Sequence, residues 1–344
     1  MRFMTPLNFC WLPIFAIILQ SALPAAAIPR KDLDTYFSWA ASHANRFGDE
    51  MCTTETIAIL VKLAFERQGR RGLIIDVGAN LGNVAEHFLK VFSLPTFMAN
   101  AGQPVAGTLD LCQDMNSRLT YYGFEPHHLL FPHLKEKLQP YSTHHQIRVL
   151  PVAVSNFSGT AQLYHGCGDV SFQGASLVKT EHLDRRGKCR YKVTVVTLDQ
   201  KFYHNKVVRQ SGIFLLKIDA EQNDALVLEG GWRLLRNRMV KFLIFETWLK
   251  TAHGISFQGM VAKLHSIRYV CFLVTKVALV PLSSSWWQPQ YKALGVSNVL
   301  CGQSGDRDLF DAYIAYGTNN FTLFYALSNL LGDLDFVRTS LGRS

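Results

Sequence analysis

Four short apolar runs in the middle of the chain each reach an acidic residue at or next to their last position, and stretches with helical periodicity separate them. Runs of this length without polar alternation are typical of strands buried on both faces of a parallel sheet. Strands that alternate with helices predict an α/β fold: a Rossmann-like, doubly wound, mostly parallel sheet with helices on both faces, preceded by an N-terminal helical segment. The four acids are Asp76, Glu125, Asp219 and Glu246.

These acids mark the expected ligand site. Ligands of open parallel sheets bind beyond the carboxyl ends of the strands, at the point where the strand order reverses. A carboxylate is costly to desolvate in that location, so its presence there points to function.

Periodicity and composition divide the chain into four expected segments. These are a signal peptide or anchor at 1–27, an N-terminal helical segment at 28–72, the α/β core at 73–250, and a C-terminal segment at 251–344. The last segment holds two further strand candidates and a helical pattern at 321–331, so we expect it to complete the sheet and end in a helix.

Three more strands are predicted inside the core. Residues 147–154 form a further apolar run, which we expect to be the third strand along the chain. Residues 159–164 and 192–197 alternate apolar and polar residues, as antiparallel edge strands do. Between 93 and 118 the proline and glycine content predicts an irregular insertion.

The N-terminus carries a targeting signal. Arg2 precedes an uncharged stretch with its apolar centre at 11–19, and the alanines at 25–27 are the small residues that signal peptidase requires. Pro24 breaks the helix ahead of them. We therefore expect entry into the secretory pathway, with cleavage near Ile28 favoured over an uncleaved type II membrane anchor, whose length the apolar stretch approaches.

Cysteines and sequons agree with a lumenal or secreted location. Six cysteines lie outside the signal, an even number that permits disulfides, and Cys167 with Cys189 would close a short loop. Buried free thiols are the alternative. Sequons at Asn156 and Asn320 predict a glycoprotein. No C-x-x-C or paired His/Cys spacing occurs in the sequence, so we expect no metal site.

The formal net charge of +9 does not by itself indicate a nucleic-acid partner. The lysines and arginines are dispersed, and no run interleaves them with aromatic residues as in single-strand binders. We expect a solvated basic face and no nucleic-acid partner.

A glycine-containing turn at 78–82 follows the first predicted strand. Gly78 and Gly82 allow the backbone to approach a ligand closely, and the next helix begins with free N–H groups. The spacing differs from G-x-G-x-x-G, which counts against a nicotinamide dinucleotide. Glu125 can accept two hydrogen bonds from a ribose diol. Dinucleotides and other nucleoside cofactors both contain such a diol, so this residue does not distinguish between them.

Taken in order, these segments resemble the FkbM family of methyltransferases over about residues 73 to 250. The matching segments are Ile75–Gly82, Gly123–Pro126, Val152–Ser155, Val196–Asp199, Leu216–Glu221, Leu228–Gly230 and Ile244–Glu246. The family's D-x-E-G-x-E segment begins here at Asp219, with Gln222 in place of the glycine and Asp224 in place of the last acid. That difference puts the local backbone shape in question.

The resemblance implies an S-adenosylmethionine site, with Glu125 on the ribose. The other donor-binding residues that it implies are Asp76, Gly78, Asn80 and Gly82. His127 and His128 lie close to this site in sequence, and we interpret them as exposed residues at a helix start.

Methyl transfer mostly requires the protein to position donor and acceptor, and a hydroxyl acceptor gains from a nearby base. Asp219 and Glu221 are our candidates for orienting or deprotonating the acceptor, and Glu246 is a weaker third. We expect an O-methyltransferase acting on a hydroxyl, with a carbohydrate or glycoconjugate favoured by the secretory location. The alternative is a catalytically silent lumenal binding protein that keeps the fold, which Gln222 favours.

Overall fold

The computed structural model describes residues 61, 64, 65, 67–69, 71–93, 118–166, 174–177, 188–247, 254–274, 279–289, 291 and 297–309. Structural statements below concern these residues. The targeting signal, most of the N-terminal helical segment, the insertion between 93 and 118, Asn320 and the helix expected at 321–331 lie outside them.

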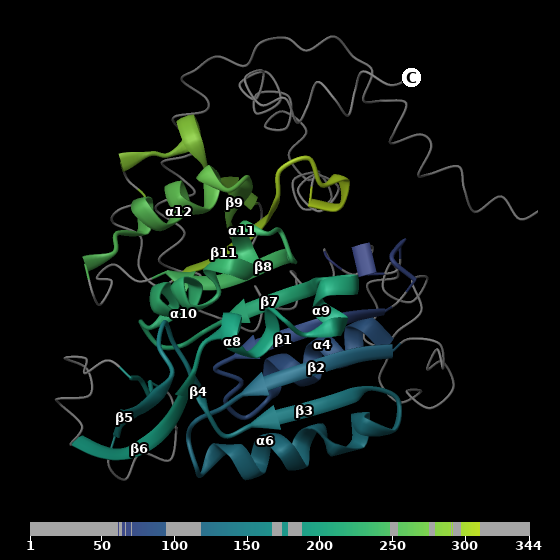
Figure 1. Ribbon diagram of the computed structural model, residues 1–344, viewed down its shortest axis with the longest axis vertical. Helices are drawn as coiled ribbons and strands as arrows, with labels where there is room; N and C mark the ends of the chain where they lie inside the picture. Colours follow the sequence, from purple (N-terminus) through teal and green to yellow (C-terminus); the bar gives the residue numbers. More distant parts are fainter. Residues whose placement is uncertain are drawn as a thin grey trace, which may run out of the picture.

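An eight-stranded sheet occupies the centre of the fold (Figure 1). Its order is β10-β9-β11-β8-β7-β1-β2-β3. In chain order the strands are β1 (Arg71–Val77), β2 (Arg118–Phe124), β3 (Gln146–Leu150), β7 (Ile213–Ile218), β8 (Val240–Thr247), β9 (Tyr269–Val274), β10 (Leu279–Pro281) and β11 (Ser297–Gln303). β3, β2, β1, β7 and β8 run parallel, and β11 is antiparallel to both of its neighbours. The predicted Rossmann-like, doubly wound α/β fold is confirmed, and the strand order reverses between β1 and β7.

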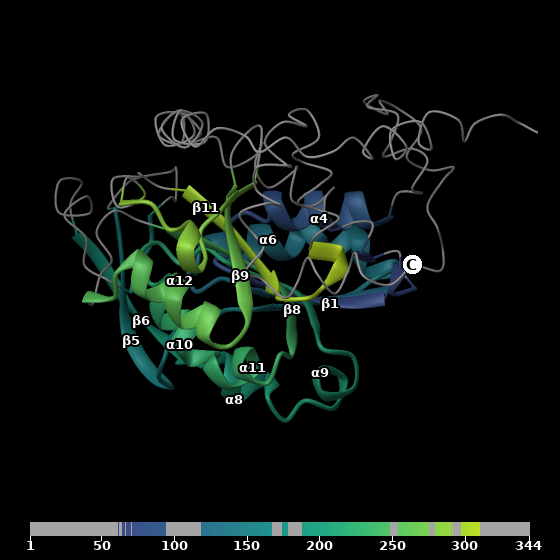
Figure 2. The same ribbon diagram turned by 90° about the horizontal axis from the view of Figure 1, so that it is seen from above.

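Helices cover both faces of this sheet. Figure 2 shows α4 and α6 on one face, and α8, α9, α10 and α11 on the other. The helices are α4 (Asn83–Ser93), α6 (Leu130–Leu138), α8 (Leu198–Phe202), α9 (Lys206–Ser211), α10 (Asp224–Gly230), α11 (Trp232–Arg236) and α12 (Phe257–Ser266), with short 3-10 turns η2 (Gln139–Thr143) and η4 (Ser284–Trp286). The central strands β1 and β7 are almost wholly buried between these layers.

Aromatic rings connect the helix before β1 to the centre of the core. Phe65 contacts Phe92 of α4 and Phe214 of β7, and Phe214 contacts Phe242 of β8. These four rings are buried, and side chains of this size contribute about 1.5–3 kcal/mol each when they leave water. The end of the N-terminal helical segment therefore packs in the same core as the sheet.

A second, three-stranded sheet lies beyond the carboxyl ends of β2, β3 and β7 (Figure 1). Its order is β4-β6-β5, with β4 at Ala153–Val154, β5 at Gly159–Gly166 and β6 at Lys188–Val196. β5 and β6 are antiparallel, as predicted, and β5 is an edge strand, but the prediction that β6 is an edge strand is wrong, because it lies between β4 and β5.

The predicted third strand, at 147–154, is divided between the two sheets. β3 ends at Leu150, and β4 begins two residues after Pro151. Proline has no N–H to donate to a strand ladder, so the hydrogen bonding of β3 cannot continue through it. The chain bends there and enters the small sheet.

A disulfide joins the two antiparallel strands at the far side of the main sheet. Cys271 of β9 and Cys301 of β11 face each other with a Cα–Cα distance of 4.1 Å, and both are fully buried. Cys189 is also disulfide-bonded, and Cys167, which the sequence pairs with it, lies outside the described residues.

Changing Cys271→Ala and Cys301→Ala together should lower the free energy of unfolding by about 3–4 kcal/mol. The reason is that the cross-link spans 30 residues and restricts the unfolded chain. Urea denaturation without reductant measures the difference. In dithiothreitol the two proteins should differ much less, because neither then has the bond. Equal midpoints without reductant would contradict the assignment.

Candidate functional site

The turn between β1 and α4 is held against β2 by its own backbone. The N–H groups of Gly78 and Ala79 both donate to the carbonyl of Phe124, at 3.0 and 3.1 Å. Gly78 has a φ of +76°, and a Cβ added there would lie 1.7 Å from the carbonyl oxygen of Asp219. This position therefore needs glycine for two reasons, its left-handed backbone and the close approach of the loop after β7.

Glu125 follows β2 directly and is bound by the same turn. Its Oε2 accepts a hydrogen bond from the Asn80 N–H at 2.7 Å, and its Oε1 accepts one from the His127 N–H at 2.8 Å. Burial raises the pKa of the Glu125 carboxyl to about 7; the nearby Asp76 charge adds to the rise, while the two N–H groups and the Lys217 ammonium oppose it. A carboxylate is thus held at the end of β2 by two backbone donors.

Behind the turn lies a buried ion pair that sequence reasoning missed. Lys217, the one polar residue in β7, is 6% exposed, and its Nζ lies 3.2 Å from Oδ1 of Asp76, which is fully buried. The contact is an ion pair without the angles of a hydrogen bond. The Tyr121 hydroxyl donates to Oδ2 of Asp76 at 2.8 Å. The available signal was a lysine within an otherwise apolar strand, and in the sheet this lysine lies directly beside Asp76.

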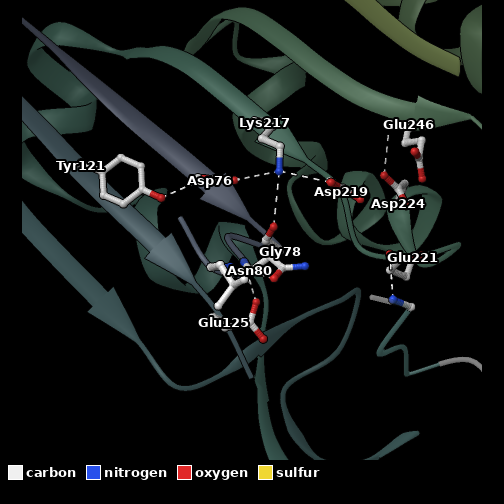
Figure 3. Close-up of polar contacts among 12 residues, drawn as sticks. Asp76, Gly78, Asn80, Tyr121, Glu125, Lys217, Asp219, Glu221, Asp224 and Glu246 are labelled. Atoms are coloured by element: carbon white, nitrogen blue, oxygen red, sulfur yellow. Dashed lines mark hydrogen bonds and ion pairs between the residues drawn. The ribbon is translucent and has the colours of Figure 1, made fainter. Parts of the chain in front are cut away.

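A pocket of about 590 Å³, which includes its opening to solvent, lies at the carboxyl ends of β1, β2 and β7. Five of the predicted site residues line it: Gly78, Asn80, Glu125, Asp219 and Glu221. Three of them do not: Asp76, Gly82 and Glu246. Figure 3 shows Asp76 on the far side of Gly78 from the Glu125 carboxylate. The apolar part of the lining comes from both sheets, from α6 and from segments beside the small sheet, and includes Val77, Phe124, Leu130, Val152, Ala153, Val154, Leu163, Ala175 and Leu177.

Gly82 has a packing role. Its φ is +79°, and an added Cβ would lie 2.6 Å from a methyl group of Leu134 in α6. The glycine therefore lets α6 approach the start of α4.

Glu221 connects the main fold to the small sheet. Its Oε1 accepts a hydrogen bond from the Gly174 N–H at 3.1 Å, and its carbonyl accepts one from the Ser176 hydroxyl at 2.6 Å. Ser176 in turn pairs with Tyr164 of β5 through both backbone groups. Residues 174–177 form part of the pocket wall, so these contacts of Glu221 hold that wall in place.

Glu246 and Asp224 are buried together at the end of β8. The Glu246 N–H donates to Oδ1 of Asp224 at 3.2 Å. Burial raises the pKa of the Asp224 carboxyl to about 8, and the charge on Asp219 adds to the rise. Oδ2 of Asp224 is buried without a hydrogen-bond partner among the described residues. The contacts of these two acids join α10 to β8, to one side of the pocket lining.

The prediction that His127 and His128 are both exposed is half wrong. His128 is exposed, but His127 is 1% exposed, and burial lowers its pKa to about 4. Its ring contacts those of His165 and Tyr191, on β5 and β6. The Tyr191 hydroxyl donates to the Pro126 carbonyl at 3.2 Å and accepts from the His128 N–H at 3.0 Å. The small sheet, whose position the sequence did not predict, is what buries His127.

Gln222, which stands where the family segment has glycine, has a left-handed backbone. Its φ is +72°, in the left-handed region, and Glu221 before it has a φ of +50°. A side chain in this region costs about 1 kcal/mol. Glycine would adopt this backbone without that cost.

Among the described residues, no group of three His, Cys, Asp or Glu side chains is arranged to hold a metal ion. Within the same part of the chain, no helix is both long and apolar enough to cross a membrane.

The solved structures that match this chain include several methyltransferases. A Methyltransferase FkbM from Methylobacillus flagellatus is 12% identical with a TM-score of 0.35, over 67% of this chain and 44% of that one. A TehB-like SAM-dependent methyltransferase from Corynebacterium glutamicum is 11% identical with a TM-score of 0.31, over 80% of this chain and 100% of that one. A Burkholderia thailandensis protein solved with S-adenosylhomocysteine is 13% identical with a TM-score of 0.24, over 84% of this chain and 69% of that one.

This chain spans less than half the length of the Methylobacillus protein. No curated protein matches it. The family model of the methyltransferase FkbM domain matches residues 76–271, which is more than half of the 344 residues. The chain belongs to the FkbM methyltransferase family.

Proposed function

We propose that this protein is an S-adenosylmethionine-dependent O-methyltransferase whose acceptor is a hydroxyl on a carbohydrate or glycoconjugate. The observation that carries the proposal is that one pocket, at the switch point of the sheet, is lined by both Glu125 and Asp219. The first is suited to bind a nucleoside donor, and the second is suited to accept a proton from the acceptor.

The residues present fit the donor. Glu125 offers a carboxylate for a ribose diol, already oriented by two backbone N–H groups. Phe124, Leu130 and Val152 offer an apolar surface of the kind that suits an adenine ring. When bound, S-adenosylmethionine supplies an electrophilic methyl group on a sulfonium.

Asp219 is the residue that we propose as the base. Its side chain is 23% exposed and lines the pocket, and its Oδ2 accepts a hydrogen bond from Lys217 at 3.4 Å. Asp219 would take the proton that the acceptor hydroxyl loses when its oxygen receives the methyl group, the methyl–sulfur bond breaks and S-adenosylhomocysteine is left. Glu221 and Asn223 add polar groups to the same wall, which suits an acceptor rich in hydroxyls. The contact of Glu221 with Gly174 favours a role in shaping that wall over a role as the base.

Donor affinity should fall as the pH drops below 7. The ionised Glu125 is the form that accepts from a diol, and its pKa of about 7 means that it gains a proton below that pH. Between pH 8.5 and 5.5 the loss should reach about thirtyfold. Calorimetric titration with S-adenosylmethionine measures it. Glu125→Gln should bind at least tenfold more weakly at pH 8.5 and lack this dependence. If the affinity of the wild type for S-adenosylmethionine changed with pH no more than that of Glu125→Gln, the assignment of Glu125 to the donor site would be wrong.

Asp219→Asn should bind S-adenosylmethionine within threefold of the wild type and lose at least a hundredfold in turnover. The substitution keeps size but removes the base, whose contribution is typically about 10²–10⁴-fold. The assay is transfer of a labelled methyl group to a glycan panel. Asp199→Asn is a matched control, because the Asp199 carboxylate caps α11 through the Arg233 and Leu234 N–H groups, and it should keep full turnover. Normal turnover in Asp219→Asn would contradict the assignment.

A catalytically silent lumenal binding protein is the second candidate. The replacement of the family glycine by Gln222 favours it, because a non-glycine residue with a left-handed backbone strains the loop that carries Asp219. A wild type that binds the donor but transfers to no member of a broad hydroxyl panel would favour this function over the first.

We also propose that the mature protein resides in the lumen of the secretory pathway or outside the cell, with a type II membrane anchor as the alternative. Two observations support this location. The Cys271–Cys301 bond and the bonded Cys189 belong in an oxidising compartment. The sequon at Asn156 lies in the turn between β4 and β5, where all three of its residues are exposed, Phe157 by 44%.

Asn156 should therefore carry an N-linked glycan when the full chain is expressed in an insect-cell secretory host. Its amide nitrogen would displace the lipid pyrophosphate from a lipid-linked oligosaccharide, with loss of one proton. Release by a peptide N-glycosidase in H₂¹⁸O hydrolyses the glycosylated amide and leaves an ¹⁸O-labelled aspartate, which peptide mass analysis locates. Ser158→Ala keeps the asparagine and should abolish the modification. A disulfide-bonded chain with an unmodified Asn156 peptide would contradict the prediction.

A further inference from the structure

One buried cation connects three segments of the site. The Lys217 Nζ donates to the Gly78 carbonyl at 3.3 Å and to Oδ2 of Asp219 at 3.4 Å, and it pairs with Oδ1 of Asp76 at 3.2 Å. Figure 3 shows the ammonium group at the centre of these three acceptors. They belong to the end of β1, to the turn after it and to the loop after β7.

Neutralising Asp76 accounts for only part of this geometry. A fully buried carboxylate needs a cation, and Lys217 supplies it. That need does not require the ammonium to bond to the pocket-lining Asp219 as well, nor to the carbonyl of the turn that we place at the donor. Tyr121 already gives Asp76 a second partner.

The contacts of the Lys217 ammonium with Asp219 and with the Gly78 carbonyl restrict the Asp219 side chain. Its carboxylate is partly exposed, and without a fixed donor it would exchange between rotamers and water. The buried ammonium is itself held by Asp76, so its contact with Asp219 favours one orientation of that carboxylate. The same ammonium holds the Gly78 carbonyl, so the base and the donor turn share one point of attachment.

We propose that Lys217 is a positioning residue for methyl transfer: it fixes the Asp219 carboxylate relative to the turn at Gly78. This inference rests on the proposed function. Its effect is on the geometry of the reacting groups, where a displacement of about 1 Å can cost up to a hundredfold in rate.

The test compares two variants that differ only in the lysine. Lys217→Met alone would leave Asp76 buried without a cation and can fail to fold. Asp76→Asn removes that charge and keeps Lys217 with Asp219 and Gly78; adding Lys217→Met then removes the ammonium from a site that no longer needs it for neutrality. Both variants are compared for unfolding temperature, for affinity for S-adenosylhomocysteine, for turnover, and by crystal structures with S-adenosylhomocysteine.

We expect the double variant to unfold within a few degrees of Asp76→Asn and to bind S-adenosylhomocysteine within threefold of it. Its turnover at saturating donor and acceptor should be at least about tenfold lower, with Asp219 in a different rotamer or in several. An unchanged Asp219 position, or equal turnover, would overturn the proposal. If the wild type transfers no methyl group, the proposed function fails, and the two crystal structures still decide whether Lys217 fixes Asp219.

Discussion

The buried ion pair between Asp76 and Lys217 is the interaction on which the site depends. It joins β1 to β7, the two strands between which the order of the sheet reverses. Two charges taken out of water are stable only with good geometry and further hydrogen bonds, and removing one partner leaves a cost of about 3–5 kcal/mol. Tyr121, Gly78 and Asp219 supply those further bonds. The ammonium of this pair therefore also connects the turn at Gly78 with the proposed base.

The small sheet completes the pocket from outside, and it is attached on two sides. On one side the Tyr191 hydroxyl binds the Pro126 carbonyl, next to Glu125. On the other, Glu221 binds Gly174 and Ser176. Between these attachments β5 contributes Leu163 to the lining, and the segment 174–177 beside it contributes Ala175 and Leu177. Part of the pocket wall thus comes from residues that are not part of the strand-helix alternation, and such residues can change without altering the main sheet.

Whether a feature could be predicted from the sequence depends on how far apart in the chain the interacting residues are. The central strands and the acids at their ends are local patterns. Runs of mostly apolar residues, such as Leu215–Ile218, predict them. Pro151 was also a local signal, and it marks the division of the third strand. The contacts of Lys217 with Asp76, the burial of His127 and the bond from Gly174 to Glu221 join residues far apart in the chain. No periodicity encodes these contacts, because the fold brings the partners together.

The contact between Gly78 and the loop after β7 affects how substitutions in these two segments combine. A side chain at position 78 would collide with the carbonyl of Asp219, so the turn and the proposed base cannot vary independently. Substitutions at the two positions should show strong epistasis, with effects on rate that do not add. A loss of activity on changing Gly78 would then report on displacement of the base as well as on the donor. Relatives that lack this glycine should carry a compensating shift in the loop that follows β7.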